Sequence, residues 1–505
     1  MKYITASKLY DYLECHHRIW RDVYGPEEEK IKEANPFVEM LWQKGIQHED
    51  KIVSSLGNFL DLSDGSLEER FQKTIEAMKN KTPLIYQGVL IYENLRGAPD
   101  LLRLIPSGEY LPIDIKSGMG TEGIIDDEGN GKLKKKYAAQ LALYVDVLRK
   151  LNFKSDFKGI ILDIKGNEIE YELASKMGAR SDETFWDFYK KIKIEVQELL
   201  NNNIQNKPAL SGKCKLCPWH NSCSKWVKEN NDLTSIFYLG GSNRDRLSED
   251  LDINNLEDFL KIDIEKVFKK KEIEKKNGNS KFLYNIGKSG LCKALERARI
   301  FCEIKKPVFC EKIEFSKTKY ELFFDIETDP TQEFVYLHGV YERNGNDEDF
   351  KYFIAEELSE DEEKKAWSDF WKYINSLPEN DFTVYYYSPY EKTTYKVLQK
   401  KYPDVISEEE VVKFFENQNV IDLYNDVILK KTDWPLGSYS IKAIAQYLGF
   451  NWRDKTPSGA LSIQWFNEYL KKKDEKILKR ILEYNEDDCM ATMVLKDEIE
   501  KLNLK

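Results

Sequence analysis

Long apolar runs are missing from this sequence of 505 residues. No run approaches the roughly 20 residues that a transmembrane helix requires, and the opening stretch MKYITASKLYDYLE has no apolar core of the kind that signal peptides carry. We therefore expect no membrane partner and a cytoplasmic location. Cysteine is also scarce, at eight residues. In the cytoplasm thiols are expected to stay free or to bind metal rather than to form disulfides.

The sequence also lacks an excess of positive charge, because 77 Lys and Arg face 88 Asp and Glu, for a net charge of -11. This balance excludes a protein that coats nucleic acid by bulk electrostatics, but it allows local basic tracts. Two such tracts are residues 132–136 and 269–271, and the second is better interpreted as a solvated face. The length predicts two or three domains.

Three apolar stretches rich in β-branched and aromatic residues predict a meander of strands in the N-terminal half. They are Leu84–Tyr92, Leu101–Ile105 and Tyr110–Ile115, and turn-forming residues separate them. Side chains two apart on a strand share a face. The alternation along these strands therefore determines which polar side chains at the strand ends lie on the same face.

Asp114 and Lys116 are two apart at the end of the third stretch, and Asp100 directly precedes the second. We expect the two carboxylates and the ammonium to converge. Carboxylates bind a divalent metal that activates water and polarises a phosphodiester, and a lysine orients the water or offsets charge in the transition state. An isolated Asp-x-Lys pair would be interpreted as a surface ion pair, so the assignment depends on the residues that accompany it.

Four motifs in order resemble the PD-(D/E)xK nuclease core of the RecB family. They are Gly45-x-x-His48-Glu49, Gly97-x-x-Asp100, Asp114-x-Lys116 and Gln140-x-x-x-Tyr144. The resemblance implies that Mg²⁺ or Mn²⁺ is bound by His48, Asp100, Asp114 and the carbonyl of Ile115. It further implies that Lys116 is the catalytic lysine and that Gln140 and Tyr144 position the substrate.

A C-x2-C-x5-C cluster formed by Cys214, Cys217 and Cys223 predicts a second kind of metal site. Three clustered thiols need a fourth ligand, and Cys15 is the natural candidate. Thiolates at this spacing suit either a tetrahedral zinc, for which His220 or His16 could replace Cys15, or an iron–sulfur cluster. The arrangement resembles the 4Fe–4S staple of AddB-like nucleases and CRISPR-adaptation exonucleases, which favours 4Fe–4S over Zn²⁺ and over unliganded thiols.

The C-terminal half has a second set of acidic residues. Asp325 and Glu327 are two apart on an apolar strand, and strands are also expected at Phe334–Tyr341 and Phe350–Ile354. Near the C-terminus Tyr484 and Asp488 are four apart on a long helix and share a face. The alternative is that these are charges at a strand end and on a helix surface.

Asp-x-Glu followed by a late Tyr-x-x-x-Asp resembles the DEDD exonuclease signature in its tyrosine variant. The resemblance implies a two-metal site with Asp325, Glu327 and Asp488 as ligands and Tyr484 positioning the attacking water. The middle motif departs from the family, because the strand leads to Glu391 where the family has an aspartate. Glu391 would then complete the ligand set, with Asp422 as a second candidate.

The segment between the two halves is charged and helical. Its Gly240-Gly241 turn and the following helices resemble a helix-hairpin-helix unit, although a purely structural connector fits equally well. The expected organisation is α/β, with a PD-(D/E)xK restriction-endonuclease-like domain at 1–229, a helical connector at 230–318 and an RNase H-like DEDD-type 3'-5' exonuclease domain at 319–505. The whole resembles RecB-like nucleases with a C-terminal YprB-like domain.

We therefore expect a metal-dependent nuclease that acts on nucleic acid, with DNA ends or single strands favoured. Two alternatives stay open: a nucleic-acid-binding or processing partner with one or both centres inactive, and an RNA-directed exonuclease, since a fold does not fix the substrate. Roles in DNA repair, CRISPR spacer acquisition and phage defence are all compatible with the resemblance. The sequence predicts no particular protein partner.

Overall fold

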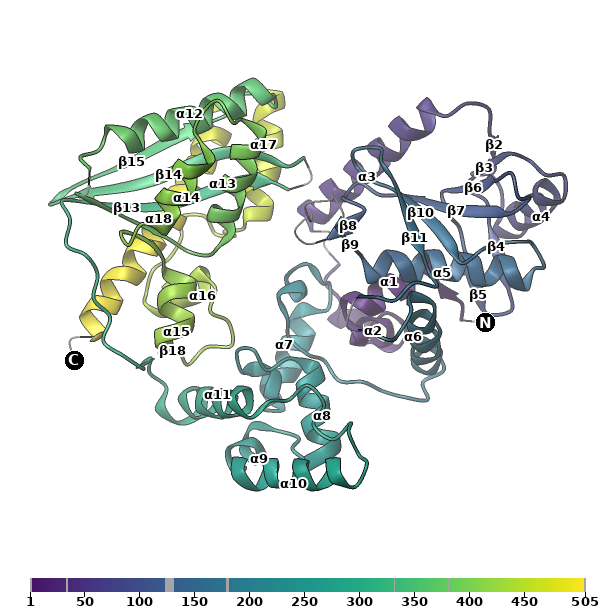
Figure 1. The fold of residues 1–505 in the computed structure, drawn as a ribbon, viewed down its shortest axis with the longest axis horizontal. Helices are drawn as coiled ribbons and strands as arrows, with labels where there is room; N and C mark the ends of the chain where they lie inside the picture. The colour runs from purple at the N-terminus through teal and green to yellow at the C-terminus, as the bar shows by residue number, and fades with distance from the viewer. Residues whose placement is uncertain are drawn as a thin grey trace. The chain divides into compact units, whose positions relative to one another are not determined.

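The computed structural model describes residues 2–32, 35–122, 131–178, 181–330, 332–379 and 381–503. The chain divides into two compact units, Met1–Lys225 and Trp226–Lys505 (Figure 1). Across these described ranges, no helix combines the length and the apolarity that crossing a membrane would demand.

The first unit is built on a sheet with the strand order β11-β10-β7-β6-β3-β2. Strand β7 lies in the middle, antiparallel to β6 and parallel to β10. A smaller sheet has the order β1-β5-β4. The strands are β1 Ile4–Thr5, β2 Leu60–Asp61, β3 Leu84–Tyr86, β4 Leu90–Tyr92, β5 Leu95–Gly97, β6 Leu101–Leu104, β7 Tyr110–Ile115, β8 Thr121–Glu122, β9 Lys132–Leu133, β10 Lys158–Leu162 and β11 Glu168–Glu172.

The expectation of one strand over Leu84–Tyr92 is wrong, because this stretch forms β3 and β4 in two different sheets. Gln87 lies between them with a left-handed backbone, at φ 54°. A strand cannot continue through that conformation. The turn also points the Gln87 side chain toward Asp100, with consequences for the site described below.

Helix α5, Lys135–Lys150, is the central helix of the first unit and is buried from Tyr137 to Leu148. It packs on the sheet face that carries Leu102 and Ile161, and α1 and α6 pack against it. The opposite face carries Ile113 and Ile115 and packs against the end of α3. The other helices are α1 Ala6–Glu14, α2 His16–Tyr24, α3 Pro36–Ser55, α4 Leu67–Lys79 and α6 Phe185–Leu200, and α7, His220–Glu229, begins in this unit and ends in the next.

The second unit contains a sheet of order β15-β14-β13-β16-β17. Figure 1 labels its strands β13, β14 and β15. Strand β13 is antiparallel to β14 and parallel to β16, so an antiparallel meander continues into parallel strands. The strands expected at Phe334–Tyr341 and Phe350–Ile354 are confirmed. The strands of this sheet are β13 Tyr320–Asp329, β14 Phe334–Asn344, β15 Asp347–Ile354, β16 Phe382–Tyr386 and β17 Val420–Asp422.

Helices cover both faces of this sheet. On one face, Leu322 and Phe324 pack against α12, α13 and α14. On the other, Phe323 packs against the long helix α18. Because side chains alternate along a strand, Asp325 and Glu327 share the α18 side with Phe323. The helices are α12 Glu360–Ser376, α13 Tyr390–Lys401, α14 Glu408–Glu416, α15 Leu429–Lys431, α16 Ile441–Tyr447, α17 Gly459–Lys472 and α18 Glu475–Asn503.

The segment that precedes this sheet is helical, as expected, and has a core that includes Leu247, Phe259 and Leu291. Its last helix is joined to the sheet region by a buried ion pair, in which Arg297 Nε lies 2.8 Å from Asp433 Oδ1. The short strands β12 Val308–Phe309 and β18 Thr432–Asp433 pair nearby. The helices are α8 Gly241–Leu251, α9 Leu256–Leu260, α10 Ile264–Lys276 and α11 Lys288–Arg299.

Candidate active sites

The first site lies where β6 begins and β7 ends. Asp114 is on β7, and the Lys116 ammonium lies 2.9 Å from its Oδ2 atom, which confirms that the two side chains share a face. Asp100 immediately precedes β6, and its Oδ2 accepts a hydrogen bond of 2.7 Å from the amide of Ile115. The antiparallel register pairs Leu101 with Ile113, so Asp100 is brought beside Asp114.

Burial dominates the electrostatics of this site. It raises the pKa of Asp100 to about 8, and the neighbouring charge of Asp114 adds to the rise while Lys116 opposes it. Burial disfavours the charged form of Lys116 too, but Asp114 and Asp100 outweigh that effect and the pKa of Lys116 is raised. This group of two carboxylates and one ammonium, of which Asp114 is buried and the other two are half-buried, retains a net negative charge when fully ionised, which suits a divalent cation.

Helix α5 brings two further predicted residues to the same place. The Tyr144 hydroxyl lies 3.5 Å from Asp114 Oδ2, and burial followed by the charge of Asp114 raises the pKa of Tyr144. Gln140 is one turn earlier and is also buried. Helix α5 can pack this close to β5 because residue 97 is glycine. A Cβ at this position would lie 2.5 Å from the Tyr144 ring.

Helix α3 contributes to the site through hydrogen bonds of Glu49 that the sequence did not predict. Glu49 Oε1 accepts hydrogen bonds of 2.9 Å from both the Tyr86 hydroxyl and the Gln87 amide. The same amide of Gln87 lies 3.2 Å from Asp100 Oδ1. His48, the expected metal ligand on this helix, has its Nε2 3.2 Å from the backbone oxygen of Asp163.

The four cysteines expected to bind metal lie in one neighbourhood of the first unit. Burial raises the pKa of Cys223 to about 11, and Cys15, Cys214 and Cys217 add to the rise. Cys15 separates α1 from α2, whereas the other three belong to the segment that ends in α7. A hydrogen bond of 2.8 Å from Trp219 Nε1 to Asp22 Oδ1 joins the two segments.

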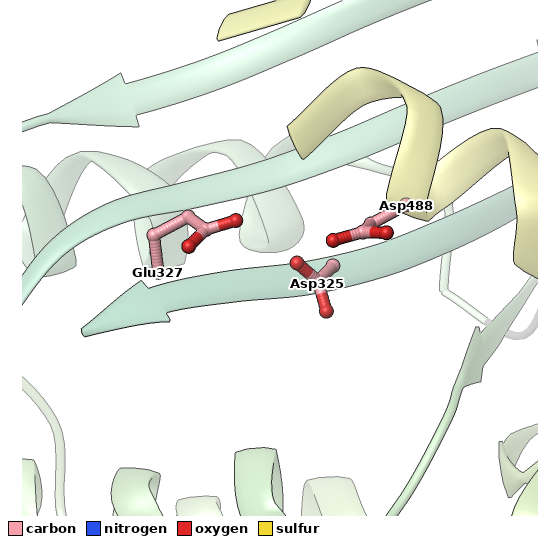
Figure 2. Close-up of side chains that lie close together, drawn as sticks. All are labelled: Asp325, Glu327 and Asp488. Carbon is pink, nitrogen blue, oxygen red and sulfur yellow. The ribbon is translucent and has the colours of Figure 1, made fainter. Parts of the chain in front are cut away.

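The second site is a compact group of carboxylates in the second unit. Oxygen atoms of Asp325, Glu327 and Asp488 all lie within 4.8 Å of one another. Figure 2 shows Asp325 and Glu327 projecting from β13 toward Asp488 on α18. The i, i+2 spacing on the strand and the position on the helix therefore bring the three side chains together as expected.

These carboxyl groups are difficult to ionise together. Burial raises the pKa of Glu327 to about 8, with the charge of Asp488 as the next cause. Burial, then Asp488, Glu327 and Glu391, raises the pKa of Asp325 well above its ordinary value. Such a group keeps protons at neutral pH unless a cation replaces them.

Several neighbours that the sequence did not reveal hold these carboxylates in place. Asn485 Nδ2 donates a hydrogen bond of 2.8 Å to Asp325 Oδ2. Trp452 Nε1 donates one of 2.8 Å to Asp488 Oδ1. Asn485 fits only because residue 339 is glycine, since a Cβ there would lie 1.7 Å from Asn485 Oδ1.

Lys442 supplies a positive charge beside the three carboxylates. Its ammonium donates a hydrogen bond of 2.6 Å to the Tyr484 hydroxyl. Its charge also counters the effect of burial on the pKa of Asp488. Lys442 lies in the first turn of α16, and the sequence did not single it out as a site residue.

Glu391 and Asp422, the candidates for the fourth carboxylate, lie nearby but outside this group of three. Glu391 is buried in the first turn of α13 and accepts a hydrogen bond of 3.2 Å from Ser388. Burial raises its pKa to about 8. Asp422 instead accepts hydrogen bonds of 3.0 and 2.8 Å from Asn425 and thus caps a helical turn.

Comparison with family models identifies both halves of the chain. Residues 11–224 match the PD-(D/E)XK nuclease superfamily, and residues 322–500 match the RNase_H superfamily. Searches of curated proteins and of solved structures returned no match. The chain thus carries a PD-(D/E)XK nuclease superfamily domain followed by an RNase H superfamily domain, and the expected α/β fold class and the superfamily of each half are confirmed.

Proposed function

We propose that this chain is a metal-dependent nuclease with two centres, of which the first is dominant and acts on DNA ends or single strands. The observation that carries the proposal is the ion pair of 2.9 Å between the buried Asp114 and the half-buried Lys116, next to Asp100. A half-buried lysine held between two carboxylates is poorly explained by stability, because desolvation offsets much of the Coulombic gain. It suits a centre that holds a cation and a phosphate.

In the first centre, Asp100, Asp114, His48 and the carbonyl of Ile115 are the proposed ligands of Mg²⁺ or Mn²⁺. Such a cation supplies a Lewis acid for the phosphate and lowers the pKa of a bound water. The Lys116 ammonium offsets charge that develops on the phosphate oxygens, and Asp114 orients that ammonium. Gln140 and Tyr144 approach from α5 and position the substrate.

The test is hydrolysis of labelled single-stranded DNA, double-stranded DNA and RNA with Mn²⁺, Mg²⁺ or EDTA. We expect cleavage with either metal, none in EDTA, and loss of most DNA cleavage in Asp114→Ala. Asp182→Ala removes a fully exposed aspartate of the same unit and serves as the matched control. Intact substrates under every condition, with Asp114→Ala identical to the wild type, would refute the nuclease assignment.

For the second centre we propose a slower exonuclease or a substrate-binding module, with RNA as the alternative substrate. Asp325, Glu327 and Asp488 are the proposed metal ligands, and Tyr484, held by Lys442, positions the attacking water. Two-metal catalysis tolerates little misplacement of its ligands. The position of Glu391 outside the group of three carboxylates supports a lower rate here than four grouped carboxylates would give.

We also propose that Cys15, Cys214, Cys217 and Cys223 hold a 4Fe–4S cluster. Four thiols around a tetrahedral zinc at about 2.3 Å would have sulfur atoms about 3.8 Å apart. Among the described residues, no three of these thiols have sulfur atoms that all lie within 4.8 Å of one another. The wider spacing supports a cluster over a single zinc.

A further inference from the structure

A cavity of about 350 Å³ opens beside Lys116 in the first unit. Its walls include Tyr10 and Asp11 from α1 and Tyr137 and Gln140 from α5. The metal ligands proposed above do not line it. A volume of this size lies at the lower end of the range for pockets that hold small organic groups. It therefore suits a group about as large as one nucleoside.

The cavity combines the aromatic rings of Tyr10 and Tyr137 with Lys116, and two further lysines outside its lining lie near these rings. The rings of Tyr10 and Tyr137 have centroids 6.4 Å apart and planes inclined by 26°. The ammonium of Lys136 lies 4.6 Å from the centroid of Tyr10, and that of Lys134 lies 5.1 Å from the centroid of Tyr137. Aromatic faces that stack bases, with cations that contact the backbone, are the usual components of single-strand binding surfaces.

Gln140 provides an independent sign of a ligand. Its side chain is 8% exposed, and its Oε1 atom has no hydrogen-bond partner among the described residues. A buried amide oxygen without a partner costs free energy, which a donor on a bound molecule would restore. Nucleobases carry such donors on the edges that base pairing occupies in a duplex. Gln140 Oε1, which lacks a hydrogen-bond partner among the described residues, therefore suits a nucleobase that is not base-paired.

We propose that this cavity holds an unpaired nucleotide next to the scissile phosphate, with its base against Tyr10 and Tyr137 and a donor of the base on Gln140 Oε1. The proposal rests on the proposed function, since Lys116 locates the phosphate. It specifies the substrate as a single strand or a frayed end. It also assigns a substrate-contacting role to Tyr10 and Tyr137.

Photo-cross-linking locates the nucleotide without any need for activity. Oligothymidylate that carries 5-iodouracil is irradiated with the full-length protein in EDTA, and the modified peptides are identified by mass spectrometry. We expect modification at Tyr10 or Tyr137, with competition by unlabelled single strands and little competition by duplex. Cross-links found only elsewhere, or equal competition by duplex, would overturn the proposal.

Affinity for the same oligonucleotide, measured by fluorescence anisotropy in EDTA, gives the second test. Tyr10→Leu should weaken binding about tenfold, whereas Tyr10→Phe, which keeps the ring, should stay near the wild type. Gln140→Leu, of similar volume, should also bind more weakly. Tyr284→Leu removes a tyrosine that is 60% exposed in the second unit and should change nothing.

Different results would refute the nuclease assignment and the nucleotide subsite. If Asp114→Ala abolishes cleavage but Tyr10→Leu and Gln140→Leu bind and cleave single strands like the wild type, the nuclease stands and this subsite is wrong. If the cross-links map to Tyr10 or Tyr137 but no metal supports cleavage, the subsite stands and the nuclease assignment is wrong.

Discussion

Removing the charge of Glu327 should stabilise the second unit at alkaline pH. Burial raises the pKa of this carboxyl to about 8 in the folded protein, from 4.5 as its ordinary value. Between these two values the folded state keeps the proton that the unfolded chain has released. The unfolded state then binds fewer protons, so the free energy of unfolding falls as the pH rises through this window.

The magnitude follows from the two pKa values. Between about pH 6 and about pH 8, a carboxyl with these values lowers the free energy of unfolding by about 2 kcal/mol. In a unit of this size that corresponds to about 5 °C in the midpoint of thermal unfolding. Glu327→Gln removes the contribution of this group. The midpoint of the variant should therefore exceed that of the wild type by about 5 °C more near pH 8 than near pH 6.

The assay is thermal unfolding of the full-length protein by calorimetry in EDTA and then in Mn²⁺. Mn²⁺ should raise the midpoint of the wild type near pH 8 and have little effect on the variant, which lacks one proposed ligand. Glu357→Gln, at an exposed loop position, is the matched control. If Glu327→Gln lowers the midpoint equally at both pH values, the carboxylate is a structural hydrogen-bond acceptor and the reasoning is wrong.

Three further predictions concern other parts of the chain. Protein purified without oxygen should be brown, and Cys217→Ser should lose the colour while Cys310→Ser keeps it; a colourless protein with stoichiometric zinc would support a zinc staple instead. Lys116→Ala should abolish cleavage by the first centre with metal affinity nearly intact, whereas Asp100→Ala should also weaken metal binding in calorimetric titrations; equal loss of affinity would make the lysine structural. Gly339→Ala should lower the free energy of unfolding by about 2 kcal/mol in urea denaturation, because the added Cβ collides with α18; an unchanged value would contradict that packing.

The parts of both sites that could be predicted are those set by local periodicity. The i, i+2 spacing placed Asp114 with Lys116 and Asp325 with Glu327, because strand geometry fixes which neighbours share a face. The order of motifs along the chain then indicated the family of each half. Neither inference required knowledge of how distant segments pack.

The parts that could not be predicted depend on long-range packing. Asn485 reaches Asp325 because α18 lies directly over Gly339, and no local pattern links these positions. Lys442 meets Tyr484 although the two are 42 positions apart in the sequence. Gln87 was hidden in an apolar stretch that looked like one strand, although its left-handed backbone divides the stretch in two.

The central claim is that one chain carries two nuclease centres of unequal strength. The most direct measurement compares Asp114→Ala, Asp325→Ala and the double variant on the same end-labelled DNA and RNA with Mn²⁺. We expect Asp114→Ala to lose most of the DNA cleavage, Asp325→Ala to lose a minor or RNA-directed fraction, and the double variant to be inactive. If Asp325→Ala abolishes all activity and Asp114→Ala spares it, the first centre is not the dominant nuclease.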